Sequence, residues 1–136
     1  MLDKTDMEIL NLLTKNSRTR WQEIGDTVHL TGQAVKNRVE RLEKSGIIET
    51  YTIKINPNKI DKKVTAFITI FMKTTEHLAF QKYIRNKPII IEAHRISGDG
   101  CYILKAAASQ DEILEFLDEI LKYGNYKINL SIENIK

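Results

Sequence analysis

Apolar residues in the first third of the chain recur at intervals of three and four, the spacing of one face of an α-helix. The pattern predicts three helices, over about residues 3–15, 20–28 and 33–44. A turn of only a few residues joins the last two. The three helices therefore have the proportions of a helix-turn-helix, with the motif itself over about residues 21–44.

Polar residues at the ends of these stretches indicate where each helix begins and ends. Asp3 is a candidate N-cap of the first helix, and Asp6 stands at the acidic position of a capping box. Thr19 is the candidate cap of the second helix, because Arg20 lacks a capping side chain. Gly46 follows the third helix, as a C-terminal glycine commonly does.

The predicted third helix separates apolar and polar residues onto two faces. Its inward stripe is apolar, whereas the outward side and the residue that opens the helix carry amides and cations. Asn and Gln can pair with adenine and Arg or Lys with guanine, and all of them can contact phosphate. The candidate DNA-binding residues are Thr31, Gln33, Lys36, Asn37, Arg38 and Arg41.

From residue 47 the apolar period changes to two, which predicts one or two strands over 47–55 as the wing of the first domain. The polar stretch 56–63 (NPNKIDKK) is the best linker in the chain. We therefore expect two domains, 1–60 and 61–136.

The second domain repeats strand and helix patterns in the order βαββαβ, the ferredoxin-like plan, so the predicted fold class is α+β. Its first strand is apolar on both faces, which predicts that the uncovered face of the sheet packs against a second copy in a homodimer. The expected elements are strands 64–73, 89–97, 101–108 and 126–132 and helices 77–86 and 109–122.

Composition changes this picture only slightly. The chain has 136 residues, with 42% hydrophobic and 29% charged residues and a net charge of +3. Basic residues are in excess over 15–44, with seven Lys or Arg against four Asp or Glu. Such a bias supports nucleic-acid binding only together with a matching motif. No stretch is long and apolar enough for a membrane helix, and the start does not resemble a secretory signal, so we expect a cytoplasmic protein.

Other chemistry finds little support in the sequence. The three histidines lie on separate elements without metal-ligand spacing, and Cys101 is the single cysteine. Ser97 precedes a Gly-Asp-Gly turn that contains Asp99, and hairpin geometry explains both residues. We expect no catalytic residue, metal or cofactor, and hence no enzyme.

These motifs together resemble the leucine-responsive/asparagine-regulator (Lrp/AsnC) family of transcription regulators. The resemblance covers nearly the whole chain, through LDKTDMEILNLLTKNSR (2–18), the helix-turn-helix at 23–48, YTIKINP (51–57) and HRISGDGCYILKA (94–106). The resemblance implies a winged helix-turn-helix with its recognition helix at 31–44. It also implies a regulatory domain that dimerises and assembles into tetramers or octamers.

The resemblance further implies an effector site. An amino acid would bind between dimers, beside Ser97, Gly98, Asp99 and Gly100. Two departures from the family pattern stand out: Arg20 opens the second helix, and Cys101 replaces a common acidic residue after the Gly-Asp pair.

The sequence leaves two other functions open. One is an architectural protein that wraps DNA with little sequence preference. The other is a small ferredoxin-like enzyme whose N-terminal helices serve only for docking.

Overall fold

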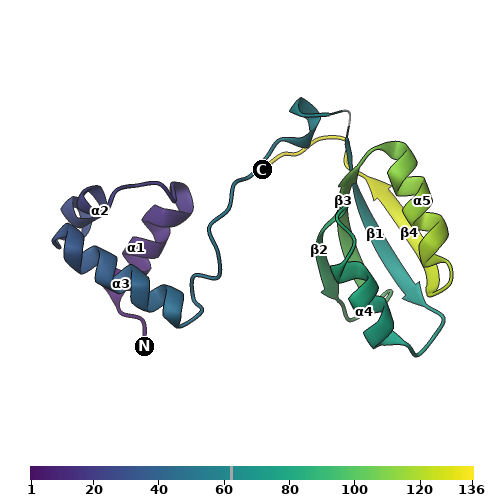
Figure 1. The fold of residues 1–136 in the computed structure, drawn as a ribbon, viewed down its shortest axis with the longest axis horizontal. Coiled ribbons are helices and arrows are strands. Elements are labelled where there is room, and N and C mark those ends of the chain that lie inside the picture. Colours follow the sequence, from purple (N-terminus) through teal and green to yellow (C-terminus); the bar gives the residue numbers. More distant parts are fainter. Residues whose placement is uncertain (62) are drawn as a thin grey trace. The chain divides into compact units, whose positions relative to one another are not determined.

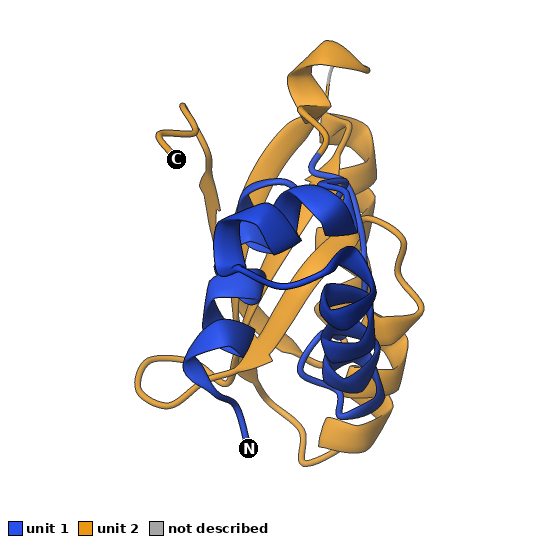
Figure 2. Ribbon diagram, turned by 90° about the vertical axis from the view of Figure 1, so that its left-hand side faces the viewer, with its two compact units in different colours: residues 1–54 blue, residues 55–136 orange. Residues whose placement is uncertain are grey.

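The computed structural model describes residues 1–61 and 63–136, and the chain divides into two compact units. Unit 1 is residues 1–54 and unit 2 is residues 55–136, coloured separately in Figure 2. Unit 1 consists of helices, whereas unit 2 combines helices with a four-stranded sheet. The predicted α+β class is confirmed. Within the described residues, no helix is long and apolar enough to cross a membrane.

Unit 1 contains the three expected helices (Figure 1), which are α1 (Lys4–Lys15), α2 (Trp21–Val28) and α3 (Gly32–Lys44). Their apolar stripes meet in one core of buried residues. The capping box of Asp3 and Asp6 is confirmed, with each side chain accepting from the other's backbone N–H. The buried core consists of Ile9, Leu13, Ile24, Val28, Val35 and Val39.

The prediction that Thr19 caps the second helix is wrong. The N-cap of α2 is Arg20, which makes no capping hydrogen bond with its side chain. The Thr19 hydroxyl instead donates to the carbonyl oxygen of Asn16 at 2.7 Å. The Thr19 side chain is thus engaged by the turn that follows α1, and the N-cap position of α2 falls one residue later, at Arg20.

The predicted strands over 47–55 are also wrong. Residues 49–56 form neither helix nor strand. Alternation indicates a strand when one face is buried, but here Ile47, Ile53 and Ile55 are all exposed. A strand also needs a neighbour to complete its ladder of backbone hydrogen bonds, and none of the described strands pairs with this segment.

Unit 2 has the expected βαββαβ order. Its strands form an antiparallel sheet in the order β2-β3-β1-β4. A 3-10 turn, Pro57–Lys59, precedes the sheet. The elements are β1 (Val64–Met72), α4 (His77–Arg85), β2 (Ile90–Arg95), β3 (Tyr102–Ala108), α5 (Gln110–Ile120) and β4 (Gly124–Leu130).

Both helices of unit 2 cover the same face of the sheet. Ile68 and Ile70 of β1 are fully buried in one core with Phe80 of α4 and Phe116 of α5. Successive side chains of a strand point to opposite faces. Phe67 and Phe71, which flank these two positions in β1, therefore lie on the uncovered face. The sheet of unit 2 thus has one face covered by helices and one open face.

Candidate nucleic-acid interface

A tight turn sets the position of α3 against α2. A Cβ atom at Gly25 would lie 2.3 Å from the carbonyl oxygen of Leu30, so glycine is needed for the two backbones to approach. His29 ends α2 in the left-handed conformation, with φ of 60°. The Thr31 hydroxyl then accepts from the N–H of Ala34 at 3.1 Å and begins α3.

Five of the six predicted DNA-binding side chains are exposed at the start or along α3. The Gln33 amide nitrogen donates to the Asn37 amide oxygen at 2.9 Å, which leaves an acceptor on Gln33 and donors on Asn37. Lys36 lies 3.9 Å from Glu40, in an exposed pair of little strength. The exposed residues are Thr31, Gln33, Lys36, Asn37 and Arg41.

The sixth residue, Arg38, is held by α1. Its Nη1 lies 2.6 Å from Oδ2 of Asp3 and 2.9 Å from Oδ1 of Asp6, and only 27% of its side chain is exposed. Hydrogen bonds between ions of opposite charge are stronger than neutral ones. Arg38 therefore joins α3 to the beginning of α1.

Arg41 makes a looser bond to the same carboxylate. Its Nη2 donates to Oδ1 and Oδ2 of Asp6 at 3.2 and 3.3 Å, yet 61% of its side chain is exposed. A guanidinium has five donors. Arg41 thus retains donors for a phosphate group while it stays in contact with Asp6.

Asp6 itself has almost no contact with solvent, with 1% exposed. Burial alone raises the pKa of this carboxyl. The backbone N–H of Asp3 and the Arg38 guanidinium outweigh that effect, and the net pKa lies below its usual range. Hydrogen bonding to Arg38 likewise lowers the pKa of Asp3. Both carboxylates are therefore ionised at neutral pH.

The predicted effector loop forms the hairpin between β2 and β3. Gly98 and Gly100 have φ of 94° and 88°, a region that favours glycine, and the side chains of Ser97 and Asp99 are exposed. A Cβ atom at Gly100 would lie 2.6 Å from Cγ2 of Thr69. Turn geometry and this close approach account for both glycines.

Comparison with known proteins agrees with this division of the chain. A family model described as winged helix-turn-helix DNA-binding matches residues 2–49, and one described as the Lrp/AsnC ligand binding domain matches residues 65–136. The chain belongs to the Lrp/AsnC family. It is a DNA-binding transcriptional regulator, with the helix-turn-helix in unit 1 and the ligand-binding domain in unit 2.

Relatives match this Lrp/AsnC regulator over nearly its whole length. It is 45% identical to the HTH-type transcriptional regulator LrpB of Bacillus subtilis, over 99% of this chain and 91% of the relative. Among solved structures, B. subtilis LrpC has a TM-score of 0.91 at 30% identity, covering 100% of this chain and 98% of that one. A Neisseria meningitidis regulator in complex with L-Met has a TM-score of 0.90 at 25% identity, covering 100% and 93%.

Sequence reasoning assigned the two N-terminal aspartates only to the capping of α1. Their bonds to Arg38 and Arg41 were missed. One signal was present, since Asp6 falls at helical spacing with the buried Ile9 and Leu13. A carboxylate on an apolar stripe requires a cationic partner when it is buried.

We predict that Asp6→Asn lowers the free energy of unfolding of unit 1 by about 2–3 kcal/mol at pH 7, because the charged hydrogen bonds to the arginines are weakened. Since the folded-state pKa is lowered, the contribution is complete above the ordinary aspartate pKa of about 4 and is lost as pH falls through the folded value. Urea unfolding followed by fluorescence of Trp21, the single tryptophan, reports on unit 1.

Asp26→Asn is the matched control, because Asp26 is exposed on α2 and accepts a hydrogen bond from Gln22 of the same helix. The control is expected to unfold like the wild type within about 0.5 kcal/mol. The assignment would be contradicted if Asp6→Asn unfolded like the wild type at pH 7. It would also be contradicted if the variant were still less stable than the wild type by the full amount at a pH below the folded-state pKa of Asp6.

Proposed function

We propose that α3 reads double-stranded DNA through Thr31, Gln33, Lys36, Asn37 and Arg41, while Arg38 positions the helix. The proposal rests on one exposed face of α3, the helix that follows the turn of the helix-turn-helix. This face carries amide and cationic side chains. This arrangement supports sequence-specific binding, and we further propose that the regulator acts in the cytoplasm.

The chemistry of that face suits a major groove. The donors and acceptors left on the Gln33–Asn37 pair match the N6 and N7 edge of adenine. Lys36 and Arg41 carry the charge that neutralises phosphates, and their weak internal pairs leave them free to exchange partners. The Nη1 group of Arg38 donates to the carboxylates of Asp3 and Asp6. Arg38 therefore contributes to DNA binding through the orientation of α3.

We also propose a homodimer built on the open face of the sheet. Phe67 and Phe71 of β1 are 40% and 37% exposed there, in the middle of the sheet rather than at its rim. Exposed aromatic residues on an ordered sheet favour burial against a partner. A dimer would carry two recognition helices, which suits half-sites about one DNA turn apart. Tetramers or octamers are then assemblies of such dimers.

The effector of unit 2 is the third part of the proposal. The Neisseria relative was solved with L-Met, which supports an amino acid as one ligand class for this chain too. Ser97, Gly98, Asp99 and Gly100 stay the predicted contacts, with Asp99 as the acceptor for an ammonium group and the loop N–H groups for a carboxylate.

For the interface on α3, we predict that the double variant Lys36→Ala/Asn37→Ala binds its operator more weakly by about 1–3 kcal/mol for the lost base contact. The slope of log affinity against log salt concentration is expected to decrease by about one, because one phosphate contact is lost. The operator is first selected from a random duplex pool with the wild type. Fluorescence anisotropy then gives affinities for the selected and the random duplex at several salt concentrations.

Asn11→Ala/Lys15→Ala is the matched control, because it removes the same two side-chain types from exposed positions of α1. It is expected to bind like the wild type. The assignment would be refuted if the Lys36→Ala/Asn37→Ala variant bound the selected duplex as tightly as the wild type does. A wild type with the same affinity for selected and random duplexes would favour the architectural function instead.

For the dimer, we predict that Phe67→Glu/Phe71→Glu sediments as a monomer at micromolar concentration, because two charges would be buried without partners in the contact. Leu78→Glu is the control, since Leu78 is 81% exposed on α4, away from the open sheet face. It is expected to stay dimeric. A monomeric wild type, or a dimeric double variant, would contradict the proposal.

A further inference from the structure

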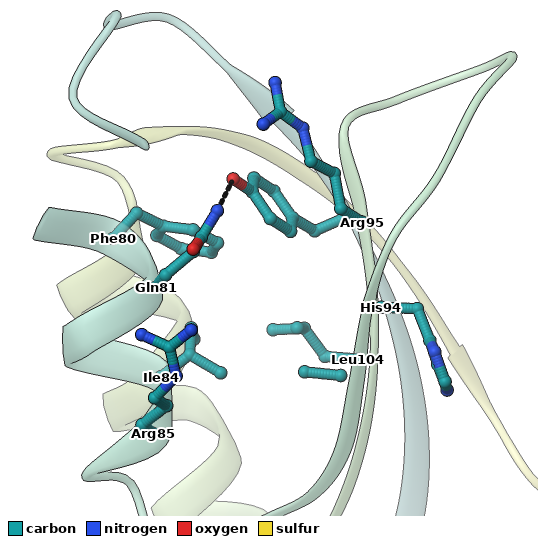
Figure 3. Close-up of a pocket in the computed structure, with 9 residues that line it drawn as sticks. Phe80, Gln81, Ile84, Arg85, His94, Arg95 and Leu104 are labelled. Atoms are coloured by element: carbon teal, nitrogen blue, oxygen red, sulfur yellow. Dashed lines mark hydrogen bonds between the residues drawn. The ribbon is translucent and has the colours of Figure 1, made fainter. Parts of the chain in front are cut away.

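A cavity of about 250 Å³ lies between α4 and the β2 side of the sheet in unit 2. Figure 3 shows Phe80, Ile84 and Leu104 lining its interior, with Arg85 on the helix and Arg95 on the strand. A cavity of this volume has room for a small metabolite.

The walls of the cavity are fixed by buried contacts. The rings of Phe80 and Tyr102 lie 4.8 Å apart between centroids, and both residues are buried. Gln81 donates to the Tyr102 hydroxyl at 3.1 Å, and the same hydroxyl is hydrogen-bonded to Nδ1 of His77 at 2.8 Å. These hydrogen bonds fix the Tyr102 side chain at one side of the cavity, and Figure 3 shows the bond from Gln81 as a dashed line.

The charge of the lining is positive and uncompensated. Arg85 and Arg95 are exposed, and neither takes part in an ion pair among the described residues. Within residues 1–61 and 63–136, no aspartate or glutamate lines the cavity. Glu92 is on the same strand, but it binds His94, whose ring points away from the cavity in Figure 3.

We propose that this cavity binds a small carboxylate with an apolar tail and discriminates against the corresponding amino acid. Two guanidinium groups attract a net negative ligand, and Arg is well suited to bind a carboxylate through paired N–H groups. A zwitterionic amino acid has no net charge, and its ammonium group would meet two cations without a compensating carboxylate. A 2-oxo acid with a branched aliphatic tail fits these conditions.

This inference rests on the assignment of unit 2 as the ligand-binding domain, but it concerns residues other than the hairpin loop. Arg95 ends β2, just before the loop that contains Ser97 and Asp99. A ligand on Arg95 therefore lies next to the segment predicted to contact an amino acid between dimers. The two sites are distinguishable because they use groups of opposite charge.

The experiment is titration calorimetry on the whole 136-residue chain with a matched pair of probes, 4-methyl-2-oxopentanoate and leucine. The oxo acid is expected to bind at least about tenfold more tightly than leucine. Arg85→Gln and Arg95→Gln are each expected to weaken its binding about tenfold or more, as loss of a charged hydrogen bond does. No DNA is present, so failure of the DNA-binding proposal leaves this result unaffected.

Two control variants test whether the oxo acid binds in this cavity rather than elsewhere on unit 2. Lys82→Gln removes a cation from α4 that does not line the cavity, and Asp99→Ala alters the hairpin loop. Both are expected to bind the oxo acid like the wild type. The proposal would be overturned by leucine binding that is as tight as that of the oxo acid and is weakened by the same arginine variants. Full binding of the oxo acid by both arginine variants, or no heat from the oxo acid at about 5 mM, would overturn it as well.

Discussion

The DNA-reading part of this regulator depends on one buried carboxylate. Asp6 is 1% exposed and binds two arginines of α3 together with the N–H of Asp3. Burying such a charge is costly unless it is paired and hydrogen-bonded. The pairing therefore restricts how α3 can lie against α1. Because Arg38 takes the inner position, the face with Gln33, Lys36 and Asn37 is directed outward.

Unit 2 is organised by a strand that is apolar on both faces. One set of β1 side chains completes the core beneath α4 and α5, and the other set remains at the open surface. This single feature links folding to assembly, because the same strand that fills the core also offers aromatic residues to a partner. The cavity that we propose as a carboxylate site lies on the helix-covered side of the sheet, where α4 meets β2.

Local chemistry made most elements predictable. The helices of unit 1 and the βαββαβ order follow from apolar periodicity and from capping residues such as Asp3 and Ser109. The strand expected over 47–55 failed because alternation alone supplies neither a buried face nor a pairing partner. The cavity was not predictable either. Arg85 and Arg95 lie on different elements, and no spacing in the sequence shows that tertiary packing brings them to one opening.

Regulation by this protein requires that the outward face of α3 contacts DNA, as we propose. The most direct test is amine-reactive footprinting of the wild-type protein with and without its selected duplex, read by mass spectrometry. Lys36 is expected to lose most of its reactivity in the complex, because a phosphate would cover its ammonium group. Lys4 and Lys15, which are exposed on α1, are expected to react as before. Unchanged reactivity of Lys36, together with protection of Lys4 and Lys15 in the complex, would contradict the assignment of α3 as the DNA-binding helix.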